Sequence, residues 1–448
     1  MTDLLKKSTI RDRWFAFQAA AVVAFVLLVV SSITPIEVGA PLAATVVLVA
    51  SRLLRTWSDP EQRALEFGLA AAALMLLVGL LAFPWRPYIA VTTLFIVPLA
   101  LGGAYLAWRG DLESRRVRLM ATGILASIVV LIGVLWIPSV APPWTDMIFL
   151  HESAAEVMLD GRNPYTDAYS VSTNPFAAEG AEYVGYAYPP LTMIAYAGSD
   201  ILFGDSRWAG VIAMVAVVAL ITRPWEVMTR RQGAALVALG LAIVVQPWLG
   251  TVIHFGWTDP VTLPLLLAGA LLWRKNPVLA AVLLGLAFGT KQYLVLALPV
   301  MLAFADDFRW KRTLIAGGVA ALTLLPAVLI DPVAFWDATI ANSLAAPVRF
   351  DSSGLAGIGL NLPFWLVAAL AVGVAVWMGR SGGGSSRFVL ALAATLSAAF
   401  LTGFQAFLNY WLFVAALALF AVVTTIRASG DVESASSLEL SPPLRTDL

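Results

Sequence analysis

"RLMATGILASIVVLIGVLWIP", residues 118–138, is an apolar run with a single charged residue, Arg118, at its start. A helix of about 20 apolar residues crosses the roughly 30 Å hydrocarbon core of a bilayer. Similar runs recur along the 448-residue chain, which is 60% hydrophobic and 12% charged. A soluble domain carries about 25% charged residues. The sequence therefore predicts an all-α, polytopic integral membrane protein.

Basic residues set the expected orientation, because connections rich in Lys and Arg remain on the cytoplasmic side. Arg115 and Arg116 precede the quoted run, which therefore delivers residues 139–190 to the outer face. A full crossing by the short run 189–204 would leave the basic stretch 223–231 outside, so we expect 189–204 to be re-entrant or half-inserted. The predicted spans are 14–33, 38–53, 64–83, 88–107, 118–138, 208–224, 233–250, 259–273, 277–290, 292–305, 313–330, 362–379, 387–404 and 409–426.

These about 14 transmembrane helices divide into an N-terminal four-helix module, residues 1–117, and a core, residues 118–426. The core has two large external loops, 139–190 and 331–361. A disordered cytoplasmic tail is expected at 427–448, where the sequence is polar and rich in serine. Both termini are predicted to be cytoplasmic, in a multi-pass protein of the cell (plasma) membrane.

Composition excludes several kinds of chemistry. The chain has no cysteine, which removes disulfides and thiol nucleophiles, and its net charge of zero gives no general attraction to nucleic acid. Its two histidines are far apart in sequence, which disfavours a His-rich metal centre. No nucleotide-binding motif is present, so any activated substrate must be reached from the membrane.

The first external loop contains "WTDMIFLHESAAEVMLDGRNPYTD", residues 144–167. Residues 147–159 have the composition of a short helix lying on the membrane surface. Gly161 suits the left-handed position that ends such a helix, and Asn163–Pro164 favours a turn. Asp146 is compatible with two roles, a helix N-cap or a carboxylate that accepts a proton from a substrate hydroxyl.

Three basic side chains on the outer face are candidate ligands for a lipid phosphate. Lys291, in "FGTKQY", and Arg349, in "APVRFDSSG", both break the inside-positive pattern. Lys291 also has a simpler interpretation as a lysine that extends outward to the interface. His254, in "HFGWTDP", completes the set.

Other polar and aromatic residues at the outer ends of the spans are candidate sugar or acceptor contacts. The tyrosines of "YVGYAYPPL" suit either the interfacial aromatic belt or a platform for a sugar ring. Helix capping explains Asp259 as well as a functional role does, and His151 suits a ligand contact or an interfacial position equally. The candidates are His151, Tyr165, Tyr188, Asp259, Gln292, Gln405 and Asn409.

Several of these motifs together resemble a known family. The chain resembles GT-C superfamily membrane glycosyltransferases, and most closely glycosyltransferase family 87, the polyprenyl-phosphate-mannose-dependent α-mannosyltransferases. The resemblance is carried by Asp146, "LDGRNPY" at 159–165, "YAYPPL" at 186–191, "GLAFGTKQY" at 285–293 and "NYW" at 409–411. It covers about residues 118–426. The family usually places its first external loop directly after the first helix, whereas four predicted spans precede span five here.

The resemblance implies inverting transfer of a sugar, mannose above all, at the extracytoplasmic face of the cell envelope. The donor is a polyprenyl-phosphate-linked sugar, and the acceptor is a hydroxyl of a glycan or glycolipid. It implies that Asp146 is the general base and that Lys291 faces the donor phosphate. We expect no cofactor, with a divalent metal as the disfavoured alternative.

Two other function classes remain open. A lipid or polysaccharide transporter would carry charges deep within its spans, whereas the span interiors here are nearly free of charge. A glycan ligase or polymerase with a polyprenyl-diphosphate donor would be expected to carry more basic residues around an external loop, and residues 139–190 contain a single arginine, Arg162. A non-catalytic scaffold is the remaining alternative.

Overall fold

The structure is a computed structural model of the 448-residue chain. The described residues are 87–138, 146–166, 168–170, 182–246, 248–304, 309–341, 344, 354–380, 384–403 and 408–439, with scattered positions between 61 and 72. The predicted spans at 14–33 and 38–53, most of the span at 64–83, and the candidates Arg349 and Gln405 lie outside these residues.

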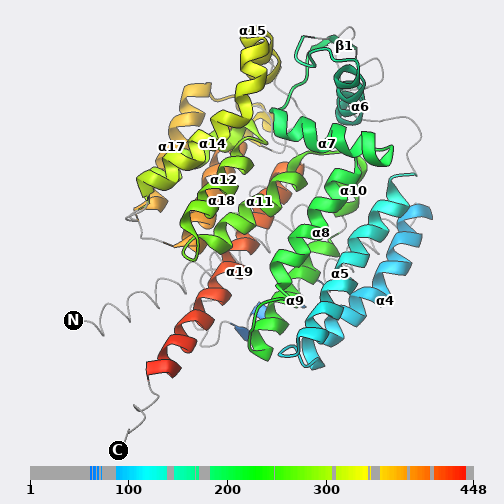
Figure 1. The fold of residues 1–448 in the computed structure, drawn as a ribbon, viewed down its shortest axis with the longest axis vertical. Coiled ribbons are helices and arrows are strands. Elements are labelled where there is room, and N and C mark those ends of the chain that lie inside the picture. Colours follow the sequence, from blue (N-terminus) through cyan, green and yellow to red (C-terminus); the bar gives the residue numbers. More distant parts are fainter. Residues whose placement is uncertain are drawn as a thin grey trace, which may run out of the picture.

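Most described helices run side by side as tilted rods (Figure 1). Sequence neighbours pack as antiparallel pairs, notably α4 with α5, α11 with α12, and α17 with α18. The rods are α4 (Pro87–Arg109), α5 (Arg115–Trp136), α8 (Trp208–Thr222), α9 (Arg230–Val244), α10 (Trp248–His254), α11 (Asp259–Leu272), α12 (Pro277–Phe288), α13 (Ala297–Ala303), α14 (Arg309–Ile330), α17 (Phe364–Gly379), α18 (Ser385–Thr402) and α19 (Leu408–Glu439).

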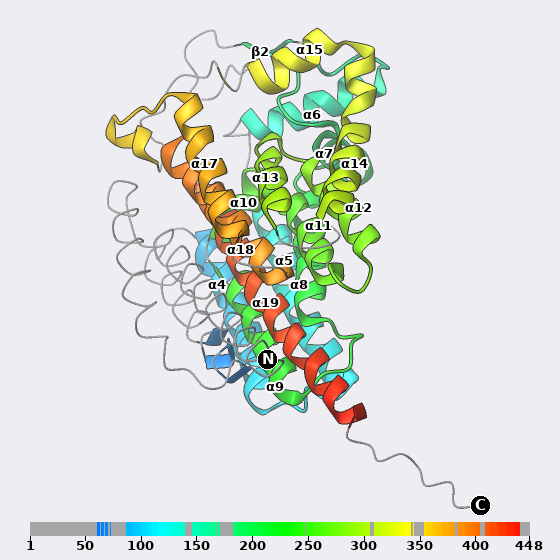
Figure 2. The same cartoon turned by 90° about the vertical axis from the view of Figure 1, so that its left-hand side faces the viewer.

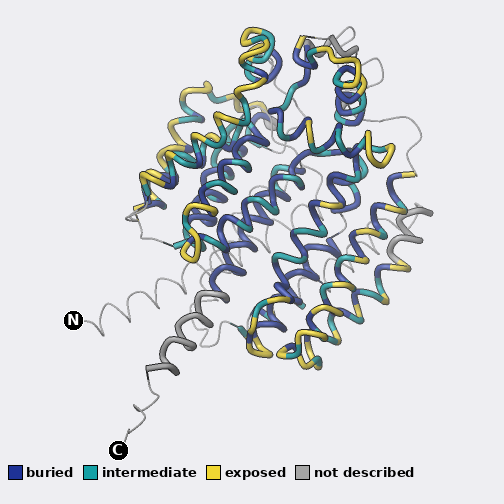
Figure 3. The backbone as a smooth tube through the Cα atoms, in the orientation of Figure 1, coloured by how far each residue is buried: buried dark blue, intermediate teal, exposed yellow. Residues whose placement is uncertain are grey.

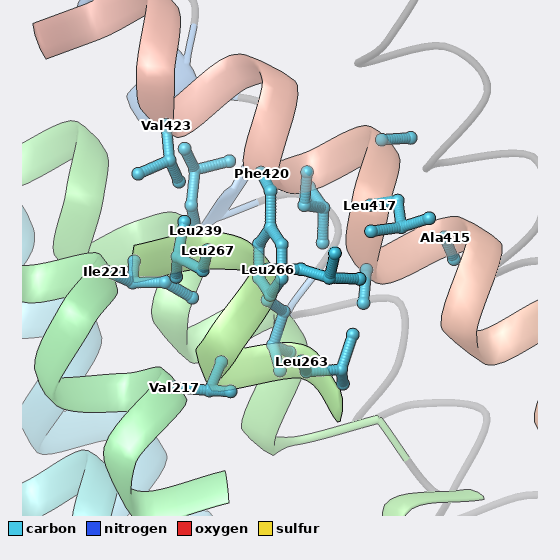
Figure 4. Packing of buried hydrophobic residues seen from close by; sticks show 14 of the residues in the cluster. Val217, Ile221, Leu239, Leu263, Leu266, Leu267, Ala415, Leu417, Phe420 and Val423 are labelled. Atoms are coloured by element: carbon cyan, nitrogen blue, oxygen red, sulfur yellow. The ribbon is translucent and has the colours of Figure 1, made fainter. Parts of the chain in front are cut away.

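Helices α9 and α19 form the centre of the bundle, and both are buried along most of their described length (Figure 3). Leu239 of α9 and Phe420 of α19 meet residues of α8 and α11 in one hydrophobic cluster (Figure 4). Small residues permit this close packing: a Cβ on Gly240 would lie 3.0 Å from the side chain of Leu125. The core is therefore apolar at its centre.

A second layer covers one end of the rods (Figures 1 and 2). It contains α6 (Asp146–Leu159), an antiparallel pair of strands, β1 (Ala168–Ser170) and β2 (Glu182–Val184), and the consecutive helical turns α15 (Pro332–Trp336) and η3 (Asp337–Ala341). The two loops that the sequence places outside the membrane, 139–190 and 331–361, thus meet at one end. The strand pair is a small exception to the predicted all-α fold.

Helix α6 confirms the helix predicted at 147–159, but its apolar side faces protein and not a membrane surface. Leu150, Ala154 and Val157 are buried, and α6 packs on α7 (Pro190–Phe203). Gly161 ends the helix with φ of 69°, as predicted, while the Arg162 N–H donates to the Val157 carbonyl at 3.0 Å. The helix is therefore a packed part of the fold and does not rest its apolar face on lipid.

The segment predicted to be re-entrant, 189–204, forms α7 and does not continue straight into α8. The axes of the two helices differ by 108° across a short break. Gly204, with φ of 71°, ends α7 in the left-handed conformation, and Asp205 forms an ion pair with Arg207 at 2.6 Å in the break. The pair has the geometry of a broken span or a re-entrant loop, in line with the prediction.

The prediction of about 14 spans is not confirmed. Among the described residues, α5, α14, α18 and the 409–426 part of α19 are long and apolar enough to cross a membrane, and the bent α7–α8 pair brings the number to five. Several other apolar helices have only 10–17 residues. At about 1.5 Å per residue, such helices fall short of a roughly 30 Å hydrocarbon core. The count of about 14 spans therefore stays a prediction.

The predicted domain boundaries stay predictions, and two features of the structure bear on them. Helix α19 continues to Glu439, so residues 427–439 are helical where the sequence predicts a disordered tail. Helix α4, which falls in the predicted N-terminal module 1–117, packs against α5 and α9 and contributes Ala100 and Ala107 to the main hydrophobic core. The described part of that module therefore shares one core with the rest of the chain.

Candidate active site

Helix α6 is fixed to the bundle through His151, which is fully buried. Its Nε2 donates to the Gly256 carbonyl at 3.3 Å, so its Nδ1 carries a lone pair and accepts the Tyr186 hydroxyl at 2.9 Å. The ring also stacks on Tyr196, with centroids 4.3 Å apart. Burial lowers the pKa of His151 to about 3, so the imidazole is neutral at physiological pH. Both nitrogens are engaged within the protein, which suits neither of the two predicted roles of His151.

Of the three loop tyrosines whose side chains the structure describes, two are turned inward. Tyr165 is buried, and its hydroxyl donates to the Tyr188 carbonyl at 3.0 Å. Tyr186 is buried against His151. The Asn163 side chain accepts the Tyr165 N–H at 3.1 Å, which makes the turn predicted for Asn163–Pro164. Tyr165 and Tyr186 thus stabilise the loop, while Tyr188 remains half-buried at its edge.

Asp259 and Lys291 form a buried ion pair between α11 and the turn after α12. The Lys291 Nζ lies 3.7 Å from Asp259 Oδ1, and the side chains are only 3% and 4% exposed, respectively. The same carboxylate accepts the Tyr293 hydroxyl at 2.6 Å and the Asn409 Nδ2 at 2.7 Å. Asp259 is the first residue of α11, but no capping bond is made at this helix start by Thr258. The side chain of Asp259 therefore joins distant elements instead of serving as a local cap.

Three tyrosine rings surround the Lys291 ammonium. Its Nζ lies 4.8 Å from the ring centroid of Tyr188, 5.6 Å from that of Tyr293 and 6.0 Å from that of Tyr410. The negative faces of aromatic rings attract cations, most strongly where water is excluded. Lys291 does not extend outward to the interface, because it is held inside a cage of rings and a carboxylate.

Tyr188 connects this cage to the start of α6. Its hydroxyl donates to the Met147 sulfur at 2.8 Å, and its ring is the one nearest to Lys291. Asp146 precedes Met147 and is the first residue of α6. Tyr188 therefore contacts both the Lys291 ammonium and the residue that follows Asp146. The sequence alone did not establish this proximity.

Gln292 lies beside the same cage. Its Nε2 donates to the carbonyls of Ala187 at 3.0 Å and Thr339 at 3.2 Å, and this fixes the amide orientation. Its Oε1 is buried and has no hydrogen-bond partner among the described residues. Gln292 thus joins the two loops that the sequence predicts to be external, and it presents one acceptor that has no partner among the described residues.

His254 does not join this group. Its Nδ1 donates to the Trp136 carbonyl at 3.2 Å, and its ring packs on those of Trp136 and Phe255. Burial lowers the pKa of His254 to about 4, so it is neutral and its remaining nitrogen is an acceptor. An acceptor repels phosphate oxygens, and the geometry does not support the predicted phosphate contact.

The structure therefore brings together part of the predicted set and adds to it. The residues that meet are Asp259, Lys291, Gln292, Asn409 and Tyr188, with the α6 start at Asp146 beside them. Tyr293 and Tyr410 were missed by sequence reasoning. Tyr293 follows Gln292 and Tyr410 follows Asn409 in the motifs quoted above. Their position next to a candidate residue could therefore have identified them.

No group of three or more acidic or histidine side chains that could hold a metal ion occurs within the described part of the chain. The expectation that the site needs no metal stays a prediction.

The comparisons with known proteins agree with the motifs. The model of glycosyltransferase family 87 matches residues 186–403, which confirms the predicted resemblance over this range. The match indicates that the chain is a glycosyltransferase. It includes Tyr188, Asp259 and Lys291, whereas Asp146 lies before its start. No curated protein and no solved structure matches the chain significantly.

Proposed function

Because the model of glycosyltransferase family 87 matches residues 186–403 of this chain, we propose that it transfers a sugar from a polyprenyl-phosphate donor. The sugar is mannose, and the acceptor is a hydroxyl of a glycan or glycolipid. Transfer takes place at the extracytoplasmic face of the membrane, where the capping layer of α6, β1, β2 and α15 lies in this proposal. The buried cationic cage beside the start of α6 carries the proposal.

Transfer breaks the bond between sugar C1 and the phosphate oxygen, and forms one between C1 and the acceptor oxygen. The Lys291 ammonium stabilises the negative charge that develops on the departing polyprenyl phosphate. The Asp146 carboxylate takes the proton of the acceptor hydroxyl as that oxygen attacks from the opposite side of the ring. The configuration at C1 of the sugar is thereby inverted in one step, without a covalent enzyme intermediate.

The contacts of Tyr188 support these two roles of Lys291 and Asp146. The phosphate must reach Lys291, and the acceptor must lie near the start of α6. Tyr188 touches both, through its ring on Lys291 and its hydroxyl on Met147. Its half-buried ring offers a face for the sugar between them. Gln292 Oε1 adds an acceptor for a sugar hydroxyl.

The other predicted contacts take different places in the proposal. Asn409 acts through Asp259, to which it donates, and Tyr165 and His151 support the loop from inside. Arg349 and Gln405 remain candidates for the phosphate and the sugar, respectively.

The experiment that tests the proposal is transfer from radiolabelled polyprenyl-phosphate mannose in membranes that contain the full chain. We expect Asp146→Asn to lower turnover by roughly 10²–10⁴-fold, the usual contribution of a general base. Glu156→Gln is the matched control, because Glu156 is an exposed carboxylate on the same helix. Equal turnover of Asp146→Asn and wild type would remove Asp146 as the base.

A parallel donor series tests the substrate class. Polyprenyl-phosphate glucose and a polyprenyl-diphosphate-linked sugar are offered under the same conditions. Preference for the glucose donor would overturn mannose as the sugar. Turnover with the diphosphate donor alone would replace the proposal with a ligase or polymerase activity.

A further inference from the structure

Asp259 stands at the meeting point of three separate chain segments: the start of α11, residues 291–293 and the start of α19. Its carboxylate begins α11, receives the Asn409 amide from α19 and the Tyr293 hydroxyl from η2 (Gln292–Leu296), and faces Lys291 in the turn before η2. The two neutral donors lie at 2.7 Å and 2.6 Å, both full hydrogen bonds. The position of the carboxylate is therefore fixed independently of the lysine.

The lysine is held more loosely than the carboxylate. Its Nζ lies 3.7 Å from Asp259 Oδ1, beyond the range of a strong charge-assisted hydrogen bond. An ammonium has three N–H donors, and a single distant carboxylate oxygen does not saturate them. The Nζ also lies closer to the Tyr188 ring than to those of Tyr293 and Tyr410, so it sits toward the α6 side of the cage.

A buried ion pair costs desolvation energy that its attraction barely repays, so such a pair is weak evidence of stability. Here the partners that surround the pair are uncharged, and the charges of Lys291 and Asp259 sum to zero. In this arrangement the carboxylate favours the protonated form of the buried lysine before an anionic ligand binds.

We propose that Asp259 is a positioning residue, which keeps Lys291 charged and directed toward the Tyr188 side, where the donor phosphate binds. The inference rests on the proposed function for the identity of the anion. Asp259 itself touches neither the sugar nor the phosphate, which differs from the sugar contact expected from the sequence. Tyr293 and Asn409 act through Asp259 by fixing its carboxylate.

The direction of the pH effect follows from the two influences on Lys291. Burial lowers the pKa of Lys291, and the opposite charge of Asp259 raises it again. Removing the carboxylate leaves only the effect of burial, so Lys291 loses its proton at a lower pH. The titratable groups that face the lysine or its carboxylate are His151, Tyr188, Tyr196, Asp259, Tyr293 and Tyr410.

The test is binding of a short-chain polyprenyl phosphate, without sugar, to the purified full chain in detergent at about pH 6 and about pH 9. Above the pKa of a lysine, each further pH unit lowers the fraction of its charged form about tenfold. We expect Asp259→Asn to bind comparably to wild type at the lower pH and at least about tenfold more weakly at the higher pH. Wild type should change much less over this range.

Three further variants separate the possible outcomes. Lys291→Ala should lose binding at both pH values; if it binds as wild type does, the phosphate role of Lys291 in the proposed function fails. If Lys291→Ala loses binding while Asp259→Asn follows wild type at both pH values, the positioning role is overturned and the proposed function stands. Glu156→Gln should follow wild type.

The third variant covers the case in which Asp259→Asn does not fold, as judged by gel filtration. Asn409→Leu removes one hydrogen bond to Asp259 and leaves both charges in place. We expect a smaller weakening at the higher pH in the same direction. An Asn409→Leu profile identical to wild type would then overturn the positioning role.

Discussion

At the scale of single residues, His151 shows how burial changes the role of a titratable side chain. A histidine in a loop that the sequence predicts to lie outside the membrane is an obvious candidate for ligand contact. Here both ring nitrogens bond within the protein, to Gly256 and Tyr186, and the ring stacks on Tyr196. The residue therefore joins α6 to the middle of α7 and to the turn after α10, and its contribution is to stability.

The stability of the chain should consequently depend on pH through His151. The folded state keeps this imidazole neutral down to about pH 3, whereas the unfolded chain takes up a proton below about 6.5. The unfolded state thus binds more protons, and stability falls as the pH drops from about 6.5 toward 3, with no change above that window. We predict that His151→Phe weakens this dependence in thermal unfolding of the purified protein.

The same variant should lower stability at neutral pH. Phenylalanine keeps the stacking on Tyr196 but removes both hydrogen bonds of the imidazole, to Gly256 and to Tyr186, which costs about 1–3 kcal/mol. His254→Phe is the control for the second histidine, and the double variant should show the flattest profile. An acid dependence unchanged in His151→Phe would contradict the assignment.

At the scale of elements, the closure of the first external loop depends on Gly185. This residue has φ of 80°, and an added Cβ would collide with the Tyr165 backbone carbonyl, which cannot move aside cheaply. Gly161 also has positive φ, 69°, but a Cβ there would meet nothing within 4 Å. Both glycines have a left-handed backbone, but only at Gly185 would a side chain also collide with a neighbour. Comparing substitutions at the two positions therefore distinguishes the cost of backbone strain from the cost of the collision.

We predict that Gly161→Ala lowers the free energy of unfolding by about 1–2 kcal/mol, the cost of the left-handed conformation alone. Gly185→Ala should cost clearly more and should lower transfer activity, because Tyr188 and Lys291 lie just beyond the displaced segment. Thermal unfolding and transfer by the same preparations provide the measurement. Equal effects of the two substitutions would show that the Tyr165 contact does not constrain the loop.

The helices themselves explain which expectations failed at this scale. The motif 159–165 encodes its own turn through Gly161 and Asn163, and both behave as predicted because the bonds are local. By contrast, runs such as 277–290 become helices too short to cross a bilayer straight. Hydropathy reports only that a segment avoids water, and a segment buried among other helices meets that condition as well as a membrane span does.

At the scale of the whole molecule, the capping layer and the ends of the rods opposite it should lie on different sides of the membrane. The natural absence of cysteine allows single cysteines to be placed without background. Arg162 lies on an exposed turn of the capping layer, and Val227 is fully exposed in the loop between α8 and α9.

We predict that Arg162→Cys reacts in intact cells with a membrane-impermeant maleimide, because the capping layer faces outward. Val227→Cys should react only after permeabilisation, since basic residues on its loop hold it inside. The cysteine-free parent is the control for unspecific labelling. The reverse pattern would place the site in the cytoplasm and contradict a donor taken from the outer leaflet.

The amino-acid sequence by itself determined the helical membrane character, the turn chemistry of the first external loop and the resemblance to glycosyltransferase family 87. Each of these rests on composition or on residues close together in the chain. Only the tertiary structure decided that Asp259 pairs with Lys291, that Asn409 joins them across 150 positions, and that Tyr188 links this cage to the start of α6. Contacts between distant elements depend on how helices pack, and the energy of that packing is spread over many apolar side chains that carry no individual signal.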